Sequence, residues 1–256
     1  MFSEAQFNLF ILAWVALAIV VFVILMFINA PYGRHLRDGW GINIPARLGW
    51  ITMESPTIIV MTLYLYYYYF VLGRSELVGA LFYLIWTSHY IHRTLVWPFR
   101  AQINKKKMPL SIALFAIFFN TINTSINAES IFKVHAPYPA HWITSPQFIC
   151  GALLFIVGMY INISSDNILI KLRKQSPDDY VIPKSGLYSW VSSPNYLGEI
   201  LEWIGWAIAT WSLAGFSFAF WVIANLVPRA RSNHHWYLEN FEDYPKNRKK
   251  LIPGVW

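Results

Sequence analysis

Long apolar runs separated by short polar segments make up most of the chain. A helix needs about 20 apolar residues to cross the hydrocarbon core of a bilayer, and most of the runs approach or exceed this length. They cover residues 7–29, 51–72, 77–97, 110–126, 148–169, 196–213 and 214–227. The pattern predicts an all-α, polytopic membrane protein with about seven transmembrane helices, which form a single membrane-embedded domain over residues 1–256.

The basic residues of the connecting segments predict the orientation of these spans. If the N-terminus lies outside, every Lys and Arg except Arg74 and Lys133 falls on the cytoplasmic side. Cytoplasmic loops of membrane proteins carry such an excess of positive charge. We therefore expect the N-terminus outside and the C-terminus in the cytoplasm. Polar cytoplasmic segments are expected at residues 30–48, at residues 171–191 and from Arg229 onward.

The composition supports a membrane location and narrows the possible partners. Of the 256 residues, 56% are hydrophobic and only 13% are charged, whereas soluble domains have about 25% charged residues. The formal charge of +7 is explained by the loop charges, so nucleic acid is not an expected partner. A lone cysteine, Cys150, excludes a Cys-based metal site, and the adjacent His234 and His235 are too close for the usual zinc spacing. No metal is expected.

Residues 192–203 carry the most unusual polar groups. Asn195, Glu199 and Glu202 lie at spacings of four and three, so a helix stacks them on one face. Carboxylates inside a membrane span are costly and mark functional sites. The alternative is that Glu199 and Glu202 lie in the headgroup region and only solvate a helix end.

Other polar groups fall inside or next to the predicted spans. The asparagines of the fourth span favour interhelical hydrogen bonds, and Asp166 could pair with Arg173. Together, acidic and amide groups near a basic rim suit a bound nucleotide, with Arg for its phosphates. Neither a G-x-G-x-x-G nor a P-loop motif is present. The groups are Glu54; His89, Tyr90, His92 and Arg93; Asn120, Asn123 and Asn127; Asn162, Asp166 and Arg173; and Arg229, His234, His235 and Tyr237.

Several segments resemble the steroid 5α-reductase family. These are INISSDNILIKLRK at residues 161–174, the long stretch at residues 180–220, residues 234–253, HYIHRTLVWPF at residues 89–99 and the segment around Glu54. The similarity covers most of the chain from about Trp50 and suggests a bacterial homologue. Related patterns occur in sterol reductases and in isoprenylcysteine-type methyltransferases.

The resemblance implies a seven-helix membrane enzyme that uses NADPH to saturate the Δ4 double bond of a 3-oxo-steroid. It implies that Glu54 and Tyr90 contact the 3-carbonyl and that Trp50 and Met53 border the substrate. Met53 stands where human-type members usually have Gln, and Asn233 where a family histidine can stand. The implied cofactor residues are Arg93, Asn162, Asp166, Arg173, Tyr180, Asn195, Glu199, Arg229, Asn233 or His234, and Tyr237.

A simple mechanism follows from these roles. An enone accepts hydride at its β-carbon when donors in a dry site stabilise the charge that develops on its carbonyl oxygen. Tyr90 can donate its phenol proton, and Glu54 can donate when it is protonated, which apolar surroundings favour. Hydride reaches C5, and C4 takes a proton from water or a relay.

Other functions stay open at this point. A membrane methyltransferase using S-adenosylmethionine would share the nucleotide site but leave Glu54 and Tyr90 unexplained, and a sterol ring double-bond reductase is a further alternative. A seven-helix receptor or transporter is disfavoured because the spans contain no Schiff-base lysine and no repeat. The expected partners are a steroid or related enone and the lipid bilayer, with no obligate protein partner. A bacterial inner membrane is favoured, or the endoplasmic reticulum in a eukaryote.

Overall fold

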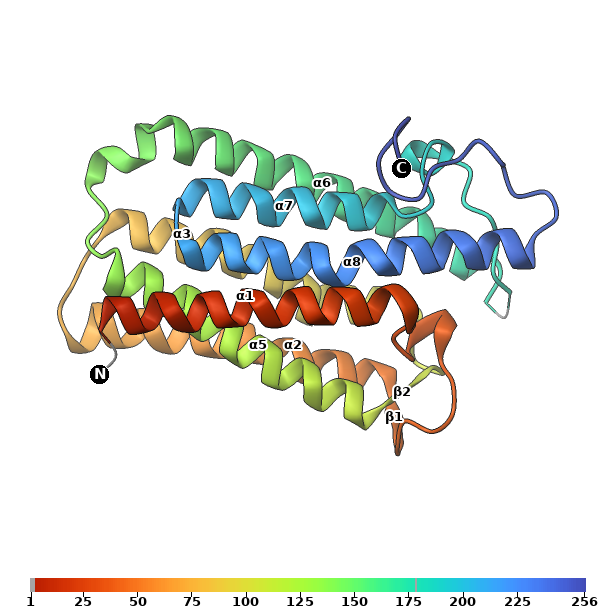
Figure 1. Cartoon of the computed structure of the whole chain (residues 1–256), viewed down its shortest axis with the longest axis horizontal. Coiled ribbons are helices and arrows are strands. Elements are labelled where there is room, and N and C mark those ends of the chain that lie inside the picture. The colour runs from red at the N-terminus through yellow and green to blue at the C-terminus, as the bar shows by residue number, and fades with distance from the viewer. Residues whose placement is uncertain (1–2, 178) are drawn as a thin grey trace. The chain divides into compact units, whose positions relative to one another are not determined.

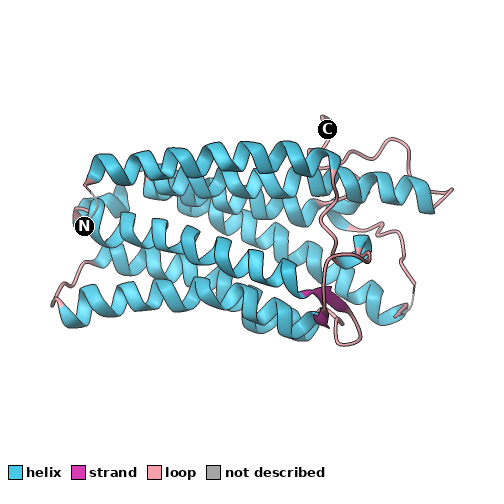
Figure 2. Cartoon of the chain, turned by 60° about the horizontal axis from the view of Figure 1, so that its bottom comes forward, coloured by secondary structure: helices cyan, strands magenta, loops and turns pink. Residues whose placement is uncertain are grey.

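A computed structural model of the chain describes residues 3–177 and 179–256. Helices dominate this part of the chain, together with one two-stranded sheet, as Figure 2 shows. The helices form two compact units. The first contains Pro31–Ile149 and the described residues up to Phe7, and the second contains Asn8–Ala30 and Cys150–Trp256. Each unit is described by itself.

The first unit is built from three long helices and a short sheet. The longest element is α2, which a π-helical turn at Tyr67–Val71 extends. A similar turn at His92–Val96 joins α3 to α4, and another at Ser130–Val134 extends α5. In chain order the elements are β1 (Asn43–Pro45), α2 (Ala46–Tyr66), α3 (Leu77–Ile91), α4 (Trp97–Arg100), β2 (Lys107–Pro109) and α5 (Leu110–Glu129).

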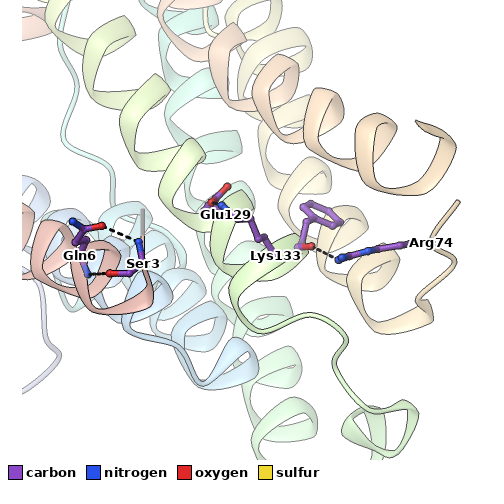
Figure 3. Close-up of polar contacts among 6 residues, drawn as sticks. Ser3, Gln6, Arg74, Glu129 and Lys133 are labelled. Carbon is purple, nitrogen blue, oxygen red and sulfur yellow. Dashed lines mark hydrogen bonds and ion pairs between the residues drawn. The ribbon is translucent and has the colours of Figure 1, made fainter. Parts of the chain in front are cut away.

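Helices α2 and α5 run parallel and form the centre of this unit. Each follows directly on a strand, and β1 pairs antiparallel with β2. Near the middle of the helices Asn120 bonds the carbonyl of Met53, and near their far ends Tyr68 stacks on Phe132 with ring centroids 6.2 Å apart. At that far end Arg74 also donates to a backbone carbonyl of the turn after α5, and Glu129 pairs with Lys133 (Figure 3). These contacts determine which residues of α2 lie beside which residues of α5.

The second unit contains four long helices, which Figure 1 labels α1, α6, α7 and α8. Their bounds are Glu4–Phe27, Pro146–Gln175, Pro194–Thr210 and Leu213–Asn240. Helices α7 and α8 are joined by a tight corner at Trp211, which has a left-handed φ of 45°, and by Ser212, whose hydroxyl accepts from Gly215 N at 3.0 Å. Helix α1 contacts α8 through Trp14 and Trp221, whose rings lie 4.9 Å apart.

Helices α6 and α7 touch backbone to backbone. Each helix carries a pair of glycines seven residues apart, Gly151 and Gly158 on α6 and Gly198 and Gly205 on α7. A Cβ on Gly198 would lie 2.4 Å from Asn162 N and 2.7 Å from Gly158 O. Small residues allow this close approach of membrane helices. The contact matters for the site because it brings Asn162 of α6 against the first turns of α7.

Every apolar run of the sequence is helical, but the helix ends differ from those expected. Among the described residues, five helices are long and apolar enough to cross a membrane, and α3 and α7, with 15 and 17 residues, are not among them. A mostly helical chain with several membrane-length helices is thus confirmed. The count of seven spans and the orientation of the termini stay predictions.

The polar segments expected from residue 171 and from Arg229 begin as continuations of helices and not as loops. Helix α6 continues to Gln175 and α8 to Asn240. Pro228 inside α8 does not end the helix, because residues beyond it continue to bury one face at helical spacing: Ala230, Asn233, His234 and Tyr237. Arg231 also donates to Met26 O at 3.1 Å at the end of α1. Tertiary contacts therefore extend α8 past the point where hydropathy falls.

Adding a methyl group at Gly198 should loosen the α6–α7 contact. The new Cβ would meet backbone atoms, which cannot rotate away, and overpacking of this kind costs about 1–3 kcal/mol. We expect Gly198→Ala to lower the melting temperature of the detergent-solubilised protein by several degrees, at about 2–4 °C per kcal/mol.

Val157→Ala is the matched control, because Val157 precedes Gly158 on α6 and is exposed. Its melting temperature should stay close to that of the parent protein. An unchanged melting temperature for Gly198→Ala would show that the helices are not held in backbone contact.

Candidate functional site

Glu54 and Tyr90 lie at nearly the same height on neighbouring helices of the first unit. Helices α2 and α3 are antiparallel, and three contacts between α2 and the segment from α3 into the following turn indicate their approximate register. Thr62 meets Tyr83 at 3.1 Å, Trp86 Nε1 donates to Thr57 O at 3.2 Å, and Trp50 Nε1 donates to Arg93 O at 3.1 Å. Between the second and third contacts, this register places Glu54 of α2 opposite His89 of α3 and within one residue of the height of Tyr90.

The surroundings of Tyr90 are aromatic. The residue is buried, and its ring lies 5.1 Å from that of Trp86 and 4.9 Å from that of His89. A ring held on two sides has few conformations left, so the position of its hydroxyl is set by packing. Glu54 is partly exposed, and its carboxylate accepts from Asn120 Nδ2 of α5 at 3.4 Å.

Arg93 and Trp50 belong to one cluster. The guanidinium of Arg93 lies 4.7 Å from the ring of Trp50 and 4.8 Å from that of Trp97, and the two rings are 4.5 Å apart. Cation–π contacts of this kind stabilise a charged group at the edge of an apolar region. The residue expected near the substrate and the residue expected near the cofactor phosphates therefore pack on each other. Met53 is buried, and its carbonyl accepts from Asn120.

In the second unit, four polar residues of α6 and α7 form one hydrogen-bonded network. Asn162 Nδ2 donates to Asn195 O at 3.0 Å and to Glu199 Oε2 at 3.3 Å. Asn195 Nδ2 donates in turn to Asp166 Oδ1 at 3.0 Å. Asn162 and Asp166 are buried, whereas Asn195 and Glu199 are partly exposed. The structure thus brings together four of the residues that the sequence singled out.

Neighbouring residues extend this network. Arg173 follows Asp166 by seven residues on α6, and therefore lies on the same face of the helix. Arg229 of α8 donates from Nε to the Tyr196 hydroxyl of α7 at 3.0 Å. Glu202 has no exposed surface. A position in solvated headgroups, considered above for Glu202, does not fit this burial.

A second cluster in this unit surrounds Ser192, just before α7. Its hydroxyl lies 2.6 Å from His234 Nδ1 and 2.7 Å from the Tyr244 hydroxyl, and it also bonds the carbonyl of Lys249 at 3.1 Å. The ring of Tyr244 stacks on that of Tyr237 at 5.0 Å. Burial raises the pKa of the Tyr244 hydroxyl above its ordinary value, although hydrogen bonds from Ser192 and Arg248 oppose this shift.

The Ser192 cluster was missed by sequence reasoning. The guanidinium of Arg248 lies 4.8 Å from the Tyr244 ring, and the next residue, Lys249, pairs with Val191 in the segment before α7. A signal was available in the sequence EDYPK at residues 242–246, which contains Tyr244 and lies inside the segment 234–253 that resembles the family. The ring of Tyr180 lies 4.9 Å from that of Trp236 on α8. Asn233 lies beside His234 on α8 and is buried.

The polar side chains of the two units offer different chemistry. The first unit presents a phenol, which can donate a hydrogen bond, and a carboxyl, which can donate one when it is protonated. The second presents amides, carboxylates and guanidinium groups, which suit the hydroxyls and phosphates of a nucleotide. No group of three or more metal-ligating side chains occurs among the residues that the structure describes.

Comparison with known proteins places the chain in a family. Residues 106–256 match the family described as 3-oxo-5-alpha-steroid 4-dehydrogenase. The chain is 40% identical to the steroid 5-alpha-reductase DET2 of Gossypium hirsutum, covering 99% of both chains. It is 37% identical to the 3-oxo-5-alpha-steroid 4-dehydrogenase 1 of Bos taurus, covering 93% of this chain and 92% of that protein. The chain belongs to the steroid 5α-reductase family.

This membership confirms the resemblance seen in the sequence and identifies the protein as an oxidoreductase family member. A third relative, the steroid 5-alpha-reductase DET2 of Arabidopsis thaliana, is 42% identical and covers 91% of this chain and 90% of its own. These relatives come from plants and a mammal, so the expectation of a bacterial homologue is not borne out.

Removing the Ser192 hydroxyl should destabilise the second unit. Ser192→Ala leaves the Tyr244 hydroxyl and His234 Nδ1 buried without this partner, and an unsatisfied buried polar group costs about 1–3 kcal/mol. We expect a lower melting temperature. Ser189→Ala is the control, because the exposed Ser189 bonds only the carbonyl of Gly186 within its own turn. Equal melting temperatures for the two variants would contradict the role assigned to Ser192.

Proposed function

We propose that the protein uses NADPH to reduce the Δ4 double bond of 3-oxo-steroids, giving 5α-reduced steroids. Membership of the steroid 5α-reductase family supports the reaction type. The observation that carries the proposal is the register of α2 and α3, which places a carboxyl and a phenol at nearly the same height inside an apolar helical unit. Such a pair is what a conjugated carbonyl needs in order to accept hydride.

The roles of Glu54 and Tyr90 follow from the charge that the reaction creates. Addition of hydride at C5 shifts an electron pair toward the 3-carbonyl oxygen, which becomes an enolate oxygen. Two donors aimed at this oxygen in a dry site stabilise it more than they stabilise the neutral ketone. Tyr90 donates its phenol proton, and Glu54 donates when it is protonated. Protonation at C4 then completes the reaction, which consumes one hydride and one proton.

The side chains of the second unit fit NADPH. Arg173 and Arg229 supply the positive charge that phosphates require, and the family resemblance implies a role near the phosphates for Arg93 as well. Asn162, Asp166, Asn195 and Glu199 offer donors and acceptors for hydroxyl and amide groups. The other proposed contacts are Tyr180, Tyr237, and Asn233 or His234. When bound, NADPH supplies the hydride, and the protein binds it, orients it and excludes water.

We also propose that the chain forms one membrane-embedded domain with seven spans, the N-terminus outside and the C-terminus in the cytoplasm. Helix α3 continues through its π-helical turn into α4, so residues 77–100 form one helical segment of sufficient length. Helix α7 has 17 residues, at the lower limit for a span. The distribution of Lys and Arg supports the orientation. The proposed substrate is a steroid or related enone, and the membrane is the only other proposed partner.

The assignment of chemistry and binding to different residues can be tested by a pair of variants. Glu54→Gln and Tyr90→Phe should each lower kcat for anaerobic NADPH consumption with progesterone or testosterone. Loss of one donor to a developing oxyanion typically costs about 10²–10³ in rate. NADPH affinity, followed by fluorescence titration of the purified protein, should change little.

Asn195→Ala provides the reciprocal control. The substitution removes the amide group with which Asn195 of α7 donates to Asp166 of α6, so NADPH affinity should fall. The proposed donor role is refuted if Glu54→Gln or Tyr90→Phe retains full turnover when the chemical step limits the rate. Unchanged NADPH affinity in Asn195→Ala would remove that residue from the cofactor site.

A further inference from the structure

Asn120 of α5 joins the backbone of α2 to the side chain of Glu54. Its Nδ2 atom lies 2.6 Å from Met53 O and 3.4 Å from Glu54 Oε2. Asn120 is buried, whereas the opposite face of α5 is apolar and exposed. An amide group placed inside a membrane helix needs partners, and here both protons of one nitrogen are directed at α2.

The short contact settles which way the amide group faces. A backbone carbonyl oxygen can only accept a hydrogen bond, so the atom 2.6 Å from Met53 O must be the nitrogen of Asn120 and not its oxygen. The same nitrogen is the atom next to Glu54 Oε2. Oε2 therefore faces a donor and must act as the acceptor in this contact.

This assignment has a consequence for the protonated carboxyl that the proposed reaction needs. A carboxylic acid has one carbonyl oxygen, which accepts, and one hydroxyl oxygen, which donates. Because Asn120 donates to Oε2, the proton of Glu54 is directed to Oε1. We propose that Asn120 is a positioning residue that holds Glu54 in the orientation and protonation pattern in which Oε1 donates to the substrate carbonyl.

Met53, the residue before Glu54, helps to hold Asn120 in place. Met53 has no side-chain donor, so residue 53 can contribute only its carbonyl oxygen, and it uses that oxygen to anchor Asn120. A polar partner of Glu54 thus comes from α5, from a residue 66 positions further along the chain. The parallel packing of α2 and α5 is what brings the two groups to the same height.

The inference rests on the proposed function and is tested with Asn120→Leu, which keeps the size of the side chain and removes the donor. We expect kcat for enone reduction to fall about 10-fold, which corresponds to the loss of one supporting hydrogen bond of about 1.4 kcal/mol. The KM for the enone and the affinity for NADPH should stay within about twofold, which also shows that the variant is folded. If Asn120→Leu does not fold, Asn120→Ala carries the same test without added apolar bulk.

A double-mutant cycle separates positioning from helix packing. If Asn120 acts through Glu54, adding Asn120→Leu to Glu54→Gln should cause little further loss of kcat. A purely structural role would lower kcat by the same factor in both backgrounds and would overturn the inference. Unchanged kcat in the single variant would overturn it as well.

Thr121→Leu is the control, next to Asn120 on α5 but on its exposed side. The Thr121 hydroxyl donates to Ile117 O within its own helix, so the change removes no contact to α2. Its kcat should equal that of the parent protein. Full turnover in Glu54→Gln would refute the proposed function, whereas a slow Glu54→Gln with a normal Asn120→Leu refutes only the role of Asn120.

Discussion

The hydrogen bonds between buried amides and carboxyls are the interactions on which this structure depends. In an apolar helical protein a polar side chain without a partner loses several kcal/mol of hydration, which favours pairing such groups with one another. Asn162 pairs in this way with Asn195 and Glu199, and Asn120 pairs with Met53 and Glu54. Polar groups that are paired are also held in place. An apolar environment thus produces oriented donors and acceptors, which a catalytic site needs.

These hydrogen bonds can form only because the helices approach each other closely at a few points. On α6 and α7, glycines at a spacing of seven remove the side chains that would keep the backbones apart. On α2 and α5, the β1–β2 pair holds the two helix starts together and the helices continue in parallel. In both cases the contact is made by small or backbone groups, and it determines which polar side chains meet. Changes in the packing of these pairs should therefore affect function without touching a functional residue.

Much of this arrangement follows from the sequence. Apolar runs predicted all seven long helical segments, and the spacing of Asn195 and Glu199 predicted their common face. The helix ends were less predictable, because the polar part of α8 is helical only through contacts such as that of Arg231 with the end of α1. Ser192 was missed because its partners, His234 and Tyr244, are 42 and 52 residues away. The orientation of Asn120 toward Glu54 depends on helix packing, which periodicity alone does not specify.

The central claim is that these polar groups serve hydride addition to an enone. Its most direct test is to follow both hydrogen atoms of the product. The purified protein is given a 3-oxo-Δ4-steroid with NADPH deuterated at the transferred position, and in parallel with ordinary NADPH in deuterated water. The account predicts deuterium from the cofactor at C5, in the 5α configuration, and deuterium from the solvent at C4. A product without cofactor deuterium at C5, or no steroid-dependent oxidation of NADPH, would contradict it.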